Sequence, residues 1–280
     1  MKNKFNSVNI IALLLVAMFT FSCQKASESQ PTQEAPKSIY QFLQGNNVKV
    51  DGHISLVATS MSFSDLPAQL DIAGHFTGKN GNFVKADKLQ VGTFDIEGNT
   101  DFHYKAHFTS SNRSQDFSDV TAALFGNTVK FTVASKEFGD VTREMHTPLA
   151  VKMDLNSIKN DEIHKSKGVT IKWNPDNGKV VLRDGEEQYM GATIIYQAGL
   201  SSNRSQQGLP TQNVTVFRYA LDGNGEITFT PEELAALPLN GYVTIMIGRV
   251  GQSVVTTSTG QTLGITSLAT SASQEIQILE

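Results

Sequence analysis

Cysteine and tryptophan are nearly missing from this chain of 280 residues, which contains one of each. A single thiol excludes an intramolecular disulfide, so the folded part must be stabilised by apolar cores. An excess of charge of one sign is also missing, because the formal net charge is only −4 and no basic run is present. A basic patch is the usual electrostatic footprint of a nucleic-acid-binding protein. We therefore predict no nucleic-acid partner.

Short catalytic motifs are missing as well. The sequence has no Gly-x-Ser-x-Gly, no His-Glu-x-x-His and no Cys/His cluster with metal-ligand spacing. We predict no enzyme and no cofactor. A hydrolase whose Asp, Glu or Ser residues meet only in the fold stays a third hypothesis, because such sites are defined in space rather than along the chain.

The N-terminal segment has the pattern of a secretory signal. Lys2 and Lys4 precede an apolar run over residues 10–21, which is interrupted only by Thr20. The run is shorter than the roughly 20 apolar residues of a membrane-spanning helix. We therefore predict a cleaved signal rather than a retained span.

The single cysteine follows this run, and its surroundings resemble the lipobox of bacterial lipoproteins. Cys23 comes after Phe21 and Ser22, an ending similar to that of Bacteroidetes lipoproteins. The family pattern prefers an aliphatic residue where this chain has Thr20 and a small one where it has Phe21. The resemblance implies a signal peptide over residues 1–22. It also implies a lipid on Cys23 that anchors the protein in the outer membrane, at the periplasmic face or the cell surface.

Residues 23–37 have the composition of a tether. After the cysteine, "QKASESQPTQEAPK" contains Gln, Ser, Glu and Pro but no large apolar side chain. Such a segment buries too little surface to offset its ordering entropy. We predict a disordered tether between the lipid and the folded part.

The remainder has the alternating pattern of β-strands. Segments such as "QLDIAGHF" and "TVKFTVAS" are rich in Val, Ile, Phe and Thr and are separated by Gly, Asn and Asp. Residues 38–160 are predicted to form one β-sandwich domain. The polar stretch over residues 156–168 is predicted to be the linker between the two domains. Residues 166–280 carry about seven further strands, one of which, "VTIKW", places Trp173 on a core face. The predicted fold is all-β, with two antiparallel β-sandwich domains in tandem.

The stretch "ITFTPEELAALPLNGYVTIMI", residues 227–247, resembles the crossing between the two sheets of immunoglobulin-like and fibronectin type III domains. Thr230 and Glu233 have the spacing of a capping box, with Pro231 at the first helical position. The resemblance implies an immunoglobulin-like C-terminal domain. It also places Tyr242 at the tyrosine corner, with its ring buried and its hydroxyl bonded to backbone.

Two patterns that are typical of metal sites do not predict one here. His103 and His107 alternate with apolar residues, so they belong to a strand, on which they would lie roughly 13 Å apart and face solvent. The stretch "DGNGE" resembles the middle of an EF-hand loop, and its candidate ligands are Asp222 and Asn224. Because two of the required carboxylate positions hold Ala220 and Pro231, we predict a turn and no bound metal.

The hexapeptide "SSNRSQ" occurs twice, at residues 110–115 and 201–206. One hypothesis is that two polar surface loops share a hydrophilic composition by chance. The other is that they are corresponding loops of duplicated domains, which bind an anionic or sugar ligand through forked hydrogen bonds. The residues of such a site are Asn112, Arg113, Asn203 and Arg204.

Two functional hypotheses from different classes result. In the first, the protein is a non-catalytic binding or adhesion module for a glycan or a protein, with Tyr189, Tyr196 and Tyr219 as its exposed rings. In the second, it is a structural subunit of an envelope complex. A cleft lined by Arg, Asn and Tyr favours the first, and a large exposed apolar patch favours the second.

Overall fold

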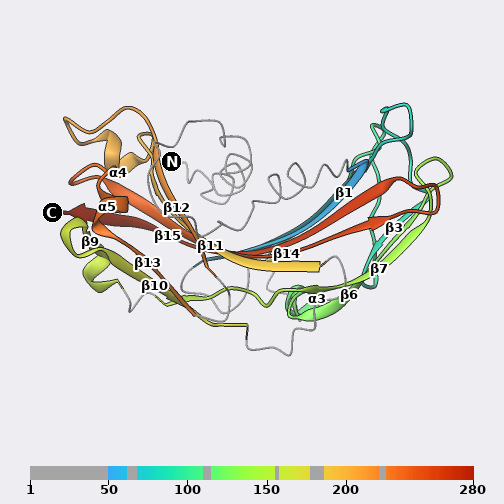
Figure 1. Ribbon diagram of the computed structural model, residues 1–280, viewed down its shortest axis with the longest axis horizontal. Coiled ribbons are helices and arrows are strands. Elements are labelled where there is room, and N and C mark those ends of the chain that lie inside the picture. Colours follow the sequence, from blue (N-terminus) through green and yellow to red (C-terminus); the bar gives the residue numbers. More distant parts are fainter. Residues whose placement is uncertain (1–49, 62–67, 110–114, 155–157, 177–185, 221–224) are drawn as a thin grey trace. The chain divides into compact units, whose positions relative to one another are not determined.

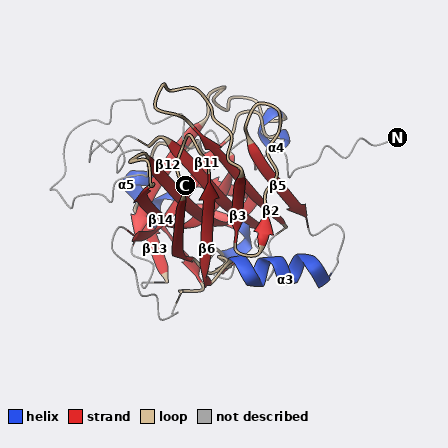
Figure 2. Cartoon of the chain, turned by 90° about the vertical axis from the view of Figure 1, so that its right-hand side faces the viewer, coloured by secondary structure: helices blue, strands red, loops and turns tan. Residues whose placement is uncertain are grey.

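The computed structural model describes residues 50–61, 68–109, 115–154, 158–176, 186–220 and 225–280. Within these ranges the chain is mostly β-strand with a few short helices (Figure 2), so the predicted all-β class is confirmed. The predicted signal peptide, the lipidated cysteine and the tether all lie outside the described residues.

The largest sheet has eight strands, in the order β12-β11-β14-β15-β1-β2-β5, with β9 paired to the end of β15 (Figure 1). Their bounds are Val214–Ala220 for β12, Glu186–Tyr196 for β11, Tyr242–Thr256 for β14, Thr262–Leu279 for β15, Gly52–Met61 for β1, Gln69–Phe76 for β2, Tyr104–Thr109 for β5 and Glu162–His164 for β9.

Strands from both predicted domains share this sheet. The strands β1 and β15 run parallel over ten residue pairs, from Gly52 opposite Leu263 to Met61 opposite Ala272. Lys49–Glu280 form one compact unit. The boundary that we predicted between the two sandwiches therefore falls inside a single unit, because the first and last long strands of that unit are neighbours.

Two smaller sheets complete the fold, a four-stranded sheet in the order β4-β3-β6-β7 and a three-stranded sheet in the order β13-β10-β8. Their bounds are Phe94–Asp95 for β4, Lys88–Val91 for β3, Asn127–Ala134 for β6, Val141–Thr147 for β7, Glu226–Phe229 for β13, Val169–Trp173 for β10 and Met153–Asp154 for β8. The helices are α3 (Gln115–Leu124), α4 (Ser201–Arg204) and α5 (Pro231–Leu234), with 3₁₀ turns η3 (Lys159–Asp161) and η4 (Lys165–Lys167).

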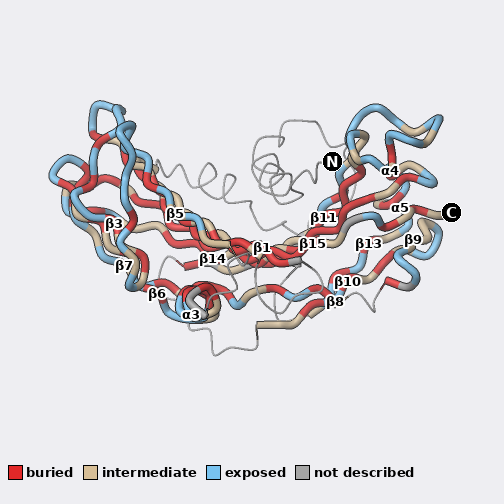
Figure 3. The backbone as a smooth tube through the Cα atoms, turned by 180° about the vertical axis from the view of Figure 1, so that it is seen from behind, coloured by how far each residue is buried: buried red, intermediate tan, exposed pale blue. Residues whose placement is uncertain are grey.

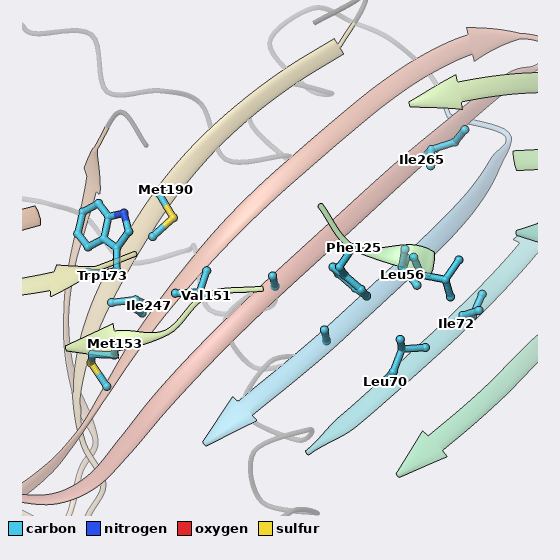
Figure 4. Close-up of a cluster of buried hydrophobic side chains, with 14 of the residues drawn as sticks. Leu56, Leu70, Ile72, Phe125, Val151, Met153, Trp173, Met190, Ile247 and Ile265 are labelled. Carbon is cyan, nitrogen blue, oxygen red and sulfur yellow. The ribbon is translucent and has the colours of Figure 1, made fainter. Parts of the chain in front are cut away.

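The core lies between the large sheet and the two smaller ones. Strand alternation sends Leu70 and Ile72 of β2 inward, while Asp71 between them stays partly exposed. Figure 3 shows long buried stretches along β1, β14 and β15. Figure 4 shows side chains of this core, among them Leu56, Leu70, Ile72, Phe125, Val151, Met153, Trp173, Met190 and Ile247. Burying each large aliphatic side chain stabilises the fold by about 1.5–3 kcal/mol.

The predicted core position of Trp173 is confirmed, and so is the capping box of α5. The Thr230 hydroxyl accepts a hydrogen bond from the Glu233 amide at 3.4 Å, and the Glu233 carboxylate accepts one from the Thr230 amide at 2.8 Å.

Tyr242 differs from its prediction, because it is only partly buried. Its neighbour Val243 takes the core side of β14, so the tyrosine lies on the other face of the strand. The buried tyrosine of this region is Tyr196, whose hydroxyl donates to the Pro210 carbonyl at 2.8 Å.

Candidate functional site

Several residues predicted from the sequence lie outside the described ranges. These are Cys23, Asn112, Arg113, Asp222 and Asn224. The side chains of Tyr189 and Tyr219 are likewise not described, and the third predicted ring, Tyr196, is buried rather than exposed.

The second copy of the repeated hexapeptide forms the short helix α4, and its asparagine faces inward. Asn203 is 2% exposed, and its side-chain oxygen accepts a hydrogen bond from the Tyr242 amide at 2.7 Å. Its amide nitrogen donates to the carbonyls of Gln197 and Tyr242, each at 2.8 Å. Both amide hydrogens are therefore used within the protein, which contradicts the predicted ligand-binding role of Asn203. Arg204 is exposed, and the first copy lies outside the described residues except for Gln115.

Helix α4 is attached where β14 and β15 are irregular. The register between these strands shifts by one residue, since Val243 pairs with Ile276 but Ile245 pairs with Ser273. Glu275 at this bulge has a φ of 64°, which is uncommon for a residue other than glycine. The Ser202 hydroxyl donates to the Glu275 carboxylate at 2.8 Å. The hexapeptide thus holds an irregular strand end in place.

Long-range pairing brings three histidines together. His53 of β1 lies opposite His75 of β2, with ring centroids 6.1 Å apart. His103, directly before β5, lies 6.3 Å from His75 on the other side. The Phe83 ring contacts both, at 5.9 Å from His75 and 4.8 Å from His103. We call His53, His75, Phe83 and His103 the ring cluster.

Local structure explains why these rings meet. Alternation on β1 and β2 buries their neighbours, such as Ile54 and Phe76, and leaves His53 and His75 on the opposite face. A turn after β2 brings Phe83 back to pair with Thr77. The described turn includes Gly81 with a φ of 80°, a conformation that glycine adopts without strain.

The loop before β5 positions the third histidine. The Asn99 side chain accepts hydrogen bonds from the amides of Asp101 at 3.0 Å and His103 at 2.9 Å. His107, which we predicted to face solvent apart from His103, is exposed and ion-paired to Asp71 at 2.7 Å. The predicted exposure of both histidines is confirmed, but His103 lies directly before β5 rather than on the strand. Its ring contacts His75, which sequence spacing cannot reveal.

The environment keeps the two inner imidazoles uncharged. Burial, with the neighbouring His75 as the second cause, lowers the pKa of His53 to about 4. Burial also lowers the pKa of His75, with His103 as the second cause. The Nε2 atom of His53 lies 3.0 Å from the Thr266 hydroxyl. Both rings are therefore neutral near pH 7.

A buried arginine was missed from the sequence. Arg249 of β14 is fully buried, and its guanidinium donates to the carbonyls of Leu149 and Asn174, both at 2.7 Å. Asp176 nearby accepts from the Leu149 amide at 3.0 Å and lies 3.5 Å from His146. The only sequence signal was one charged residue inside the apolar strand "YVTIMIGRV". The arrangement fastens two loops to the large sheet.

Within the described part of the chain, no three or more His, Cys, Asp or Glu side chains are grouped so that they hold a metal ion. None of the helices in that part is both long and apolar enough to cross a membrane.

Comparison with known proteins gives no family. No protein-family model and no curated protein matches the chain. Among solved structures, it is similar to a Ca2+-stabilized adhesin that helps an Antarctic bacterium bind ice, at 14% identity, with a TM-score of 0.18, over 81% of this chain and 49% of that one. It is also similar to a structure from a 1.5-MDa bacterial ice-binding adhesin, at 14% identity, with a TM-score of 0.20, over 83% of this chain and 67% of that one. The chain thus spans about half the length of the first structure. TM-scores this low do not establish a shared fold.

Proposed function

We propose that this protein is a non-catalytic binding module of the bacterial cell envelope that engages a glycan through the ring cluster. A lipid on Cys23 tethers it to the outer membrane, as in lipoproteins of the Bacteroidetes type. The tether over residues 23–37 separates the lipid from the folded part.

The observation that carries this proposal is the exposure of Phe83. The ring is 48% exposed although it is packed edge-on against His75. Phe102, one residue before His103, is also 36% exposed. Aromatic rings that are held in place but open to solvent present a flat apolar surface at a small cost in side-chain entropy. Such a surface suits the apolar face of a sugar ring.

The buried charges support a binding role over catalysis. Arg249 is directed at backbone carbonyls, and Arg143 donates to the Ser253 hydroxyl at 3.1 Å while lying 3.5 Å from Glu186. Groups engaged in this way stabilise the packing of loops and strands rather than contact a substrate.

A thermal-shift screen of the chain from Ser38 against a glycan panel tests the proposal. A ligand at a hundred times its dissociation constant stabilises the protein by about 2.7 kcal/mol. We expect Phe83→Ala to remove the shift and Phe217→Ala to keep it. Phe217 is a matched control, because it is 43% exposed and lies on β12, at the other edge of the large sheet. A shift that survives in Phe83→Ala contradicts the proposal.

The second candidate function is a structural subunit of an envelope complex, and Phe217 favours it. The strand β12 is an edge of the large sheet, and an edge strand offers backbone groups for pairing with a partner. If this candidate is correct, envelope proteins co-purify with the wild type and not with Phe217→Ala, and no glycan shifts the melting temperature.

A further inference from the structure

The histidines of the ring cluster form a row across three neighbouring segments of the large sheet, which metal-site patterns in the sequence did not indicate. We propose that His75 and His103 bind a divalent transition-metal ion of the Cu2+, Ni2+ or Zn2+ class. The ion uses imidazole nitrogens of the ring cluster, whereas the proposed glycan contact depends on the exposed ring of Phe83, so the two can be tested separately.

The spacing of the two rings fits one shared ion. Imidazole nitrogens bind such metals at about 2.0–2.1 Å, so two nitrogens on opposite sides of an ion lie about 4 Å apart. Ring centroids 6.3 Å apart reach this separation when the two nitrogens face each other. His103 is exposed and His75 is partly exposed, so an ion can reach the pair from solvent.

The two imidazole ligands favour Cu2+, Ni2+ and Zn2+ over Ca2+ and Mg2+. Metal binding requires neutral imidazole, and a histidine of ordinary pKa is mostly neutral at pH 7 and above. Imidazole favours Cu2+, Ni2+ and Zn2+, whereas Ca2+ and Mg2+ prefer oxygen ligands. The two imidazoles supply two ligands, so water would fill the remaining positions of the ion. The ion is therefore exchangeable, in contrast to a closed structural zinc site.

The neighbouring rings restrict the two ligands. Phe83 packs edge-on against His75 and at 61° to His103. His53 packs on the far side of His75, and its Nε2 atom is held near Thr266. Rings that are already confined lose less side-chain entropy when they bind an ion.

The test uses the full chain and the metal alone. Isothermal titration with Cu2+, followed by electron paramagnetic resonance, is expected to show one bound ion with two imidazole nitrogens. His103→Gln and His75→Ala are each expected to weaken binding at least tenfold. His107→Gln is the matched control, because His107 is an exposed histidine of the same strand region, and this variant is expected to bind as the wild type does. Ca2+ is expected not to compete.

The outcome is decisive even if one variant is unstable. His103 is exposed, so His103→Gln reports on the site if His75→Ala does not fold. Unchanged Cu2+ binding in His103→Gln, or loss of binding only in His107→Gln, overturns the proposal. Phe83→Ala separates this inference from the proposed function, because it is expected to remove the glycan response and to retain the two-nitrogen Cu2+ signal.

Discussion

Arg249 is the largest side chain among the described residues that is completely buried. Its guanidinium donates hydrogen bonds to loops that come 75 and 100 residues earlier in the chain. A planar guanidinium can serve two carbonyls in fixed directions, and a lysine ammonium cannot match this geometry. The residue therefore acts as a cross-link between segments that are distant in sequence.

Replacing this arginine tests that role. We expect Arg249→Lys to lower the free energy of unfolding by about 3 kcal/mol, because a buried ammonium cannot make both charge-assisted hydrogen bonds of the guanidinium. Urea unfolding followed by circular dichroism measures the change. Arg204→Lys, at an exposed site, is the control and is expected to change stability by less than about 0.5 kcal/mol.

His53 makes the stability depend on pH. Its pKa is about 4 in the folded protein and 6.5 in an unfolded chain, so between these values only the unfolded chain binds the proton. The stabilisation is complete above pH 6.5 and is lost as the pH falls toward 4. We expect the wild type to lose about 2 kcal/mol more than His53→Gln between pH 7 and pH 4.5, measured by urea unfolding with a chelator present.

The control is Phe217→Ala, which changes an exposed side chain without a titratable group and should keep the acid sensitivity of the wild type. Equal pH dependence in His53→Gln and the wild type would show that another group carries the effect.

Helix α4 contributes through one side chain, although it has only four residues. We expect Asn203→Ala to destabilise the protein by about 3 kcal/mol, because it removes the three hydrogen bonds that this buried side chain makes to backbone groups of Gln197 and Tyr242. Arg204→Ala in the same helix should be nearly neutral. Thermal unfolding of both variants tests the structural role, which predicts the larger loss of stability in Asn203→Ala. The ligand-binding hypothesis instead predicts that Arg204→Ala has the larger effect in a binding assay.

Helix α5 is stabilised at its first turn. Thr230→Ala is expected to cost about 1 kcal/mol, because the Glu233 amide loses its acceptor. Thr230→Ser keeps the hydroxyl and should stay close to the wild type in denaturant unfolding. A loss of equal size in both variants would mean that the methyl group, rather than the cap, matters.

Elements with local signals could be predicted from the sequence. The capping box needs only residues three apart, and the inward position of Trp173 follows from alternation within one short strand. The ring cluster had no such signal, because His53, His75 and His103 meet through strand pairing and not through spacing. The role of Asn203 was missed for the same reason, since its partner Tyr242 lies 39 residues away.

For the whole molecule, the all-β class was predictable and the arrangement of its sheets was not. Each strand shows its period in its own residues, but parallel pairing of β1 with β15 joins opposite ends of the compact unit. A polar stretch near residue 160 resembles a linker in composition. In the structure it holds β9, which pairs with the end of β15.

The shared sheet predicts a single cooperative unit. The chain from Ser38 is expected to unfold in one calorimetric transition, with equal calorimetric and van't Hoff enthalpies. Residues 166–280 alone are expected not to fold, because β15 lacks its neighbours β1 and β9. Two transitions, or a folded fragment with dispersed amide signals, would instead support two independent sandwiches.

The parallel pairing of β1 and β15 has a mechanical consequence. Gly52 lies opposite Leu263, and β15 continues past the far end of β1 to Leu279. Tension between the N-terminal end of β1 and the C-terminal end of β15 therefore pulls along both strands in opposite directions. All ten residue pairs resist this load together, in shear, and do not open one after another as in a zipper. A protein held by its N-terminus and pulled at its C-terminus would bear force at its best-connected strands.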